Sequence, residues 1–141
     1  MKILILCTGN SCRSQMAEGF LQSLDARMEV SSAGTSPAGA VHPLVVQVMQ
    51  ESGIDIAGHQ PKAVDQFLDK TFDYVITVCD DARENCPVFT GKVNHQLHIG
   101  FEDPSKVPGN DTFIRSEFRR VREEIKSEFN NLYNQILKKE L

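Results

Sequence analysis

The sequence lacks a long apolar run, a positive net charge and an internal repeat, and each absence excludes a class of protein. Hydrophobic residues make up 40% of the 141 residues, but no apolar run is long enough to cross a bilayer. The net charge of −4 argues against nucleic acid as a partner. No linker or low-complexity tract divides the chain, so we expect a single domain over residues 1–141, present as a monomer, with no membrane partner.

No signal peptide is visible either, because the N-terminus leads straight into an apolar strand pattern. The sequence therefore predicts a cytoplasmic protein. In that reducing compartment, four cysteines favour catalysis or metal binding over structural disulfides. The four histidines form no convincing metal-ligand set and are interpreted as ordinary polar residues: His42, His59, His95 and His98.

Short apolar segments alternate with amphipathic patterns along the chain, which predicts an α/β fold. The expected strands cover residues 3–6, 28–31, 74–78 and 93–99. The expected helices cover residues 13–25, 43–52, 64–68 and 114–136, and residues 80–85 form either a short helix or a loop. Strands that alternate with helices imply a parallel sheet with right-handed crossovers.

The most informative stretch is CTGNSCRS, which lies between the first strand and the first helix. Such a loop can curl so that its backbone N–H groups point inward, while Arg13 closes the ring with a planar fork suited to a tetrahedral oxyanion. The dipole of the following helix adds to the attraction for negative charge. A thiol inside this ring should ionise more easily than free cysteine, whose pKa is about 8.5, so we expect Cys7 to be a thiolate nucleophile. The expected oxyanion-binding residues are Thr8, Gly9, Asn10, Ser11, Cys12, Arg13 and Ser14.

Within this loop each residue type has an expected task. Gly9 permits a conformation forbidden to other residues, and Asn10 tolerates the left-handed region. Ser14 can donate its hydroxyl hydrogen to the Cys7 sulfur, and Cys12 fills space without an essential role. The alternative, a buried core cysteine at position 7, leaves the rest of the loop unexplained. A Walker loop is excluded because its Gly-Lys pair is absent.

Two further reactive side chains are expected at the same edge of the sheet. Cys79 and Asp103 follow expected strands, as Cys7 does, and the carboxyl ends of parallel strands form the ligand-binding edge. Asp103 could protonate an oxygen that leaves the bound oxyanion, provided that its pKa is high enough. Its alternative role is that of a turn aspartate beside Pro104.

Cys79 and Cys86 bracket the segment DDAREN. If this segment is helical, its two ends lie about 10.5 Å apart along the axis, whereas a disulfide needs Cα atoms about 4.4 to 6.8 Å apart. The pair can bond only if the segment unwinds or is already a loop, which suggests a redox switch. The alternatives are a zinc site, whose usual cysteine spacing is shorter, and unreactive packing residues, which the acidic neighbours Asp80 and Asp81 favour somewhat.

The phosphate loop resembles that of the low-molecular-weight tyrosine phosphatase family, in which cysteine, five residues, arginine and serine follow one another. With the Cys79 and Cys86 pair and residues 100–104, nearly the whole chain is similar to the thioredoxin-coupled arsenate reductases built on that fold. Gln15, in place of the phosphatases' usual proline, and the lack of an aromatic pair after Pro104 point away from phosphotyrosine. The resemblance implies a single-domain three-layer sandwich with a four-stranded parallel sheet flanked by helices.

The same resemblance implies reduction of arsenate to arsenite by a three-cysteine relay. Cys7 attacks arsenate, Cys79 attacks Cys7, and Cys86 attacks Cys79; Arg13 and Asp103 assist, and thioredoxin reduces the final disulfide. No cofactor is bound, and weak phosphatase activity accompanies reduction. The first alternative is a phosphatase that uses Cys7, Arg13 and Asp103. The second is a sensor that only binds an oxyanion or arsenite.

The resemblance also implies a set of residues that support the loop: Asn10, Ser14, Glu18, Ser32 and Lys62. In some of these reductases the matching positions organise the loop around a potassium ion with a further acidic ligand. Lys62 stands at that acidic position, so its ammonium group can replace the cation by pairing with Glu18. We therefore expect no metal site and no requirement for potassium. The alternative is that Lys62 is a solvated surface residue.

Overall fold

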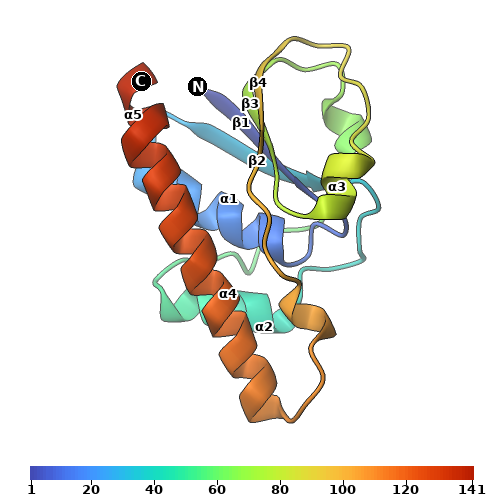
Figure 1. Cartoon of the computed structure of the whole chain (residues 1–141), viewed down its shortest axis with the longest axis vertical. Coiled ribbons are helices and arrows are strands. Elements are labelled where there is room, and N and C mark those ends of the chain that lie inside the picture. Colours follow the sequence, from blue (N-terminus) through green and yellow to red (C-terminus); the bar gives the residue numbers. More distant parts are fainter.

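A four-stranded parallel sheet lies at the centre of the computed structural model, which describes all 141 residues (Figure 1). The strand order is β2-β1-β3-β4, and every neighbouring pair is parallel. The strands are β1 (Lys2–Cys7), β2 (Glu29–Gly34), β3 (Phe72–Thr77) and β4 (Val93–His98). All four strands predicted from the sequence are confirmed, with ends that differ by a few residues.

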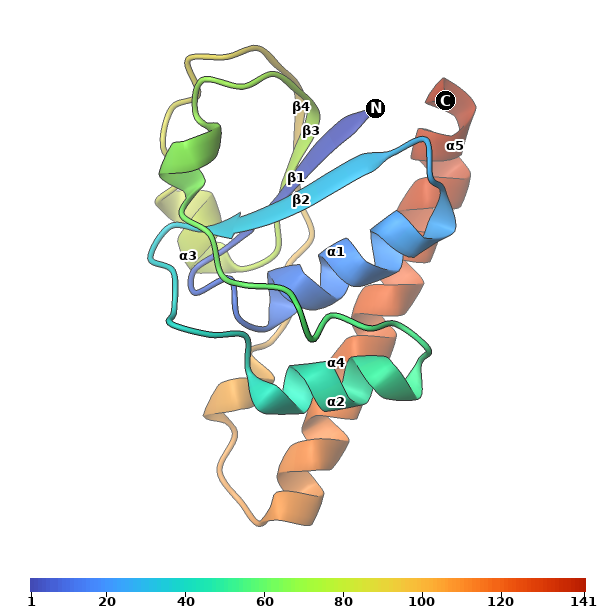
Figure 2. The ribbon, with the colours of Figure 1, turned by 180° about the vertical axis from the view of Figure 1, so that it is seen from behind.

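Helices cover both faces of the sheet, as the three-layer prediction requires (Figures 1 and 2). The α-helices are α1 (Arg13–Leu24), α2 (Pro43–Glu51), α3 (Asp80–Glu84), α4 (Asp111–Leu132) and α5 (Lys138–Glu140). Shorter turns are the 3-10 turns η1 (Val64–Phe67) and η2 (Pro104–Lys106) and the π-helical turn η3 (Tyr133–Leu137). Helices α1, α2 and α4 lie on one side of the sheet, and η1 and α3 lie on the other.

The core is a single cluster of buried side chains built on β1 and α4. Residues 3–6 of β1 are fully buried, because layers cover a central parallel strand on both faces. The apolar stripe of α4 faces the sheet through Phe118, Val121, Ile125 and Phe129, all fully buried. None of the helices combines the length and the apolar character that a membrane-spanning segment needs.

The sequence prediction was wrong about the end of β2. The segment Ser32-Ala33-Gly34 was expected to leave the strand, but it continues the pairing with β1, as far as the pair Cys7 and Gly34. Small residues are needed here because a Cβ on Gly34 would collide with the carbonyl oxygen of Thr8. Pairing along a full neighbouring strand outweighs the local turn preference of these residue types.

Candidate active site

The loop after β1 forms one wall of an open cleft of about 940 Å³ at the carboxyl edge of the sheet. Cys7 ends β1 and Arg13 begins α1, so the loop between them is held at both ends by the sheet and a helix. The opposite walls come from the start of α3, which follows β3, and from the segment that follows β4. The cleft thus collects Cys7, Arg13, Cys79 and Asp103, as the topology argument from the sequence predicted.

Arg13 reaches back over the loop with its guanidinium largely buried. One terminal nitrogen donates to the carbonyl oxygen of Phe101 at 3.1 Å, and the other lies 3.5 Å from a carboxylate oxygen of Asp103. The Nε–H is buried and has no hydrogen-bond partner. A buried donor without an acceptor is costly, so its presence beside the cleft favours an anionic ligand that accepts this hydrogen.

Asn10 adopts the left-handed conformation predicted for it, with φ of 51°, and is fully buried. Its side-chain amide donates to Ser14 Oγ at 2.8 Å and to Ser32 Oγ at 2.9 Å, while its Oδ1 accepts from the Lys62 backbone N–H at 2.9 Å. These bonds stabilise a backbone conformation that asparagine otherwise adopts at some cost. Gly9 has no positive φ, so the conformational role predicted for it was wrong.

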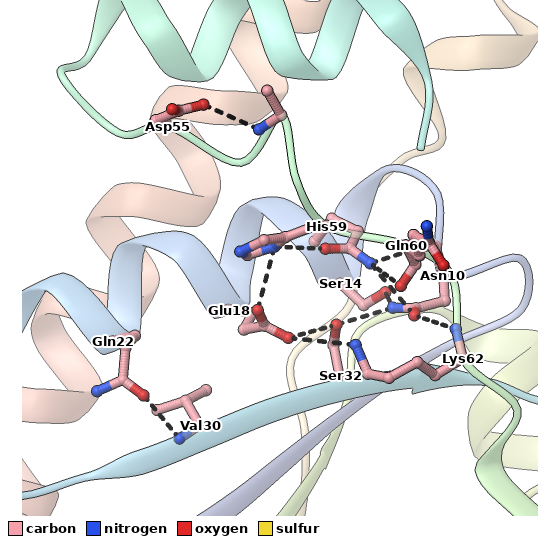
Figure 3. A network of polar contacts seen from close by, with 12 residues as sticks. Asn10, Ser14, Glu18, Gln22, Val30, Ser32, Asp55, His59, Gln60 and Lys62 are labelled. Atoms are coloured by element: carbon pink, nitrogen blue, oxygen red, sulfur yellow. Dashed lines mark hydrogen bonds and ion pairs between the residues drawn. The ribbon is translucent and has the colours of Figure 1, made fainter. Parts of the chain in front are cut away.

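A polar network behind the loop supports Asn10 (Figure 3). Ser32 Oγ donates to Glu18 Oε1 at 2.8 Å, which continues the line from Asn10 to the acidic side chain of α1. The ammonium group of Lys62 lies 4.0 Å from the same oxygen of Glu18. His59 Nδ1 lies 3.2 Å from Glu18 Oε2. The loop-support residues named from the sequence are therefore in contact with one another.

Cys7 and Cys79 lie close together in the cleft, and each side chain affects the pKa of the other. The neighbouring Cys79 side chain and burial raise the pKa of Cys7, although the charge of Arg13 and the N–H of Thr8 act the other way. The Cys7 side chain, the Ala82 N–H and the Thr8 hydroxyl lower the pKa of Cys79. The two thiols therefore ionise as a pair, and the first negative charge belongs to the pair rather than to one sulfur.

Cys79 caps the N-terminus of α3. Its sulfur accepts from the Ala82 backbone N–H at 3.4 Å and lies 3.4 Å from Thr8 Oγ1. Thr8 Oγ1 also donates to Asp81 Oδ2 at 2.9 Å, which ties α3 to the oxyanion loop. Thr8 was predicted to contribute only to oxyanion binding, and its contact with Cys79 had no signal in the sequence.

Cys86 lies outside the cleft, beyond the far end of α3. It lines a separate pocket of about 220 Å³ with Arg83 and His98. All four cysteines are free thiols, and the five residues of α3 stand between Cys79 and Cys86. The helical form of this segment, one of the two predicted alternatives, keeps these two thiols apart, so a bond between them requires α3 to unwind.

Asp103 carries a pKa below its ordinary value. Burial raises the pKa of this carboxyl, but hydrogen bonds from the hydroxyl and the N–H of Ser105 and the charge of Arg13 outweigh burial. Asp103 is therefore ionised at neutral pH. An oxyanion bound beside it would add negative charge and raise that pKa.

Two polar residues of the loop support were missed by the sequence argument. Gln15 is fully buried, and its amide nitrogen lies within 3.1 to 3.2 Å of the backbone oxygen and Oδ1 of Asn10. His59, which was interpreted as an ordinary polar residue, contacts both Gln15 and Glu18.

Cys12 is buried, and burial raises its pKa to about 12. The structure contains no group of three or more His, Cys, Asp or Glu side chains arranged to hold a metal ion.

Comparison with known proteins agrees with this geometry. Residues 2–141 match the family model for low molecular weight phosphotyrosine protein phosphatase. An arsenate reductase of Staphylococcus epidermidis is 44% identical over 126 residues, which cover 89% of this chain and 90% of that protein. An arsenate reductase solved in a phosphate-binding state superposes with a TM-score of 0.80 at 33% identity, covering 96% of this chain and 98% of that one. A thioredoxin-dependent arsenate reductase of Corynebacterium glutamicum superposes with a TM-score of 0.68 at 30% identity, covering 98% of this chain and 62% of that one. The chain therefore belongs to the low-molecular-weight phosphotyrosine protein phosphatase family.

Proposed function

We propose that this protein reduces arsenate to arsenite through Cys7, Cys79 and Cys86. The observation that carries the proposal is the presence of two neighbouring thiols, Cys7 and Cys79, in one cleft beside a loop suited to a tetrahedral oxyanion. A phosphatase of this family needs one thiol in the loop, and a second thiol in contact with it serves a transfer of electrons. Similarity to arsenate reductases over most of the chain supports the same assignment.

In the first step the Cys7 sulfur attacks arsenic. Its proton passes to the neighbouring Cys79 and then to solvent, while the Nε–H of Arg13 and the N–H groups of the loop stabilise the oxyanion. The hydroxyl hydrogen of Ser14, whose oxygen accepts from Asn10, is free to stabilise the sulfur. Asp103, with its pKa raised by the bound anion, protonates the oxygen that leaves as water. The product of this step is an arsenic–sulfur adduct on Cys7.

In the second step the Cys79 thiolate attacks the Cys7 sulfur. The arsenic–sulfur bond breaks, and its electron pair goes to arsenic, which departs as arsenite and leaves a Cys7–Cys79 disulfide. The donors that lower the pKa of Cys79 keep it ionised for this attack. The Cys86 thiolate then attacks Cys79, α3 unwinds, and the Cys7 thiolate is released. Thioredoxin reduces the resulting Cys79–Cys86 disulfide.

The loop-support residues hold the oxyanion loop without a resident cation. Asn10, Ser14 and Ser32 fix the loop, and Glu18 is neutralised by Lys62. The ammonium group supplies the positive charge that a potassium ion would bring to Glu18. The enzyme therefore works without potassium. The proposal also includes no bound cofactor, and it describes a cytoplasmic monomer whose protein partner is thioredoxin.

The alternative is a phosphatase in which water cleaves the Cys7 adduct and Cys79 is dispensable. Replacement of Cys79 by serine separates the two functions. In an assay with arsenate, thioredoxin, thioredoxin reductase and NADPH, Cys79→Ser should abolish turnover, while slow hydrolysis of an aryl phosphate survives. Full arsenate turnover by this variant would reject the relay. A single equivalent of bound oxyanion without repeated turnover by the unsubstituted protein would indicate a sensor instead.

A further inference from the structure

We infer that His59 is a positioning residue that holds the oxyanion loop through the hydrogen on its Nδ1, by way of Gln15. This inference rests on the proposed function, because it names a determinant of oxyanion affinity in that same site. It follows from a chain of hydrogen bonds in which one backbone N–H determines the orientation of every side chain after it.

The chain begins at the backbone N–H of Lys62, which can only donate. Because this N–H lies 2.9 Å from Asn10 Oδ1, that atom must be the amide oxygen, and the amide nitrogen of Asn10 faces Ser14 and Ser32. The orientation of the Asn10 amide is therefore determined by the backbone. Asn10 Oδ1 and the Asn10 backbone oxygen are then two acceptors that face Gln15.

The next link is the buried amide of Gln15. Its nitrogen lies 3.1 Å from the Asn10 backbone oxygen, 3.2 Å from Asn10 Oδ1 and 3.3 Å from the Gln60 backbone oxygen. Three acceptors around one atom require that atom to be the donating nitrogen. The amide oxygen of Gln15 consequently faces His59 as an acceptor.

His59 completes the chain. Its Nδ1 lies 3.2 Å from Glu18 Oε2 (Figure 3). The same nitrogen lies 3.0 Å from Gln15 Oε1, and both of these oxygens are acceptors. Nδ1 must therefore carry a hydrogen whether the ring is neutral or charged. A neutral ring with its hydrogen on Nε2 would place three lone-pair-bearing atoms against one another, which is unfavourable because the His59 side chain is only 32% exposed and that of Glu18 only 12%.

The consequence for the site is a restraint on Asn10, the residue with a left-handed backbone inside the oxyanion loop. The amide nitrogen of Gln15 donates to both the backbone oxygen and the side-chain oxygen of Asn10, and these bonds restrain φ and ψ of Asn10. His59 prevents the Gln15 amide from turning over, and the same Nδ1–H orients Glu18, which accepts from Ser32. Loss of the Nδ1 donor should loosen the loop and weaken oxyanion binding without touching any of the sulfurs.

Two substitutions distinguish the donor from the bulk of the ring. The amide N–H of asparagine is separated from Cα by the same number of bonds as Nδ1 of histidine. The amide N–H of glutamine is one bond farther from Cα and so matches Nε2 of histidine. His59→Gln should weaken the binding of inorganic phosphate, measured by calorimetry, by about five- to tenfold, the size expected for one lost hydrogen bond. His59→Asn should restore most of the affinity. His95→Gln is the matched control, because His95 is exposed on β4 and stacks on Tyr74 away from the loop, so its phosphate affinity should be unchanged.

Two further measurements make the outcome decisive. Nitrogen NMR of the resting protein should find the hydrogen of the neutral His59 ring on Nδ1. In a Gln15→Leu background, His59→Gln should cause no additional loss of phosphate affinity, because both residues act in one chain. Equal phosphate affinities for His59→Gln and His59→Asn, or a neutral ring with its hydrogen on Nε2, would overturn the inference. Absence of phosphate binding by the unsubstituted protein would instead reject the proposed oxyanion site, and the ring measurement would still decide the role of His59.

Discussion

Gly34 lies so close to Thr8 that a methyl group on Gly34 would collide with the Thr8 carbonyl oxygen. The end of β2 and the beginning of the oxyanion loop therefore touch through backbone atoms. Further contacts follow the same line, since Thr35 N–H donates to the Cys7 carbonyl at 3.1 Å and Ser36 N–H donates to the Thr8 carbonyl at 2.9 Å. The second strand thus shapes the loop as directly as the first.

Gly34→Ala should destabilise the protein and weaken its binding of phosphate, because the added Cβ forces the loop away from β2. The expected loss in free energy of unfolding is about 1 to 3 kcal/mol, the range for overpacking a rigid site, and urea unfolding measures it. Gly39→Ala is the matched control, since a Cβ there meets no atom within 4 Å. Equal stability of the two variants would show that the strand and the loop can move apart freely.

Thr8→Val should raise the pKa of Cys79, which its surroundings hold below the usual value for a thiol. The Thr8 hydroxyl, whose one hydrogen is shared between Asp81 Oδ2 and the Cys79 sulfur, lowers the pKa of Cys79, and its loss should move that pKa upward by up to about one pH unit. Cys79 would then hold its proton to a higher pH, so its alkylation by iodoacetamide, followed by mass spectrometry, should begin at a higher pH. Thr90→Val, which removes a hydroxyl bonded to the Leu68 carbonyl, serves as the control. An unshifted alkylation profile in Thr8→Val would contradict the role given to this hydroxyl.

Cys86→Ser should stop the relay after one turnover. Cys79 can still release arsenite, but without the third thiol the Cys7–Cys79 disulfide has no partner inside the protein. We expect about one arsenite per protein molecule and a mass lower by two hydrogens than that of the reduced variant. Cys79→Ser should yield neither the arsenite nor the disulfide. Repeated turnover of Cys86→Ser with thioredoxin would show that Cys86 is not needed to pass the disulfide to thioredoxin.

Potassium should not change the rate of arsenate reduction. Lys62 already brings a positive charge near Glu18, with 4.0 Å between its nitrogen and the carboxylate oxygen. Lys62→Asp should create a site with two carboxylates and make the rate rise as potassium is added, whereas Lys62→Met should lose activity with no recovery in potassium. Steady-state rates at constant ionic strength, adjusted with a bulky organic cation, measure the effect. A clear rate gain for the unsubstituted protein would show that Lys62 does not replace the cation.

The parts of the site that the sequence predicted are those with a local pattern. Cys7 and Arg13 are separated by a single loop, and the strand and helix that hold them have clear apolar periodicity. The convergence of Cys79 and Asp103 on the same cleft followed from the rule for parallel sheets.

The remaining parts depend on contacts between distant polar residues that follow no spacing rule. Gln15 and His59 are 44 positions apart, and nothing in the residues around either one indicates that they touch. The pKa of Cys79 depends in the same way on distant groups, Cys7 and Thr8 at the end of β1 and Ala82 in α3. The extension of β2 was missed because the small residues that permit close strand packing are also typical of turns.

Cys86 lies in a pocket of its own, and this placement affects how the substrate and the reductant reach the protein. In the proposed relay, the inorganic substrate uses the cleft, and the redox protein acts where Cys86 lies, so neither blocks the other. The bulky electron donor of this relay consequently never has to approach the oxyanion loop.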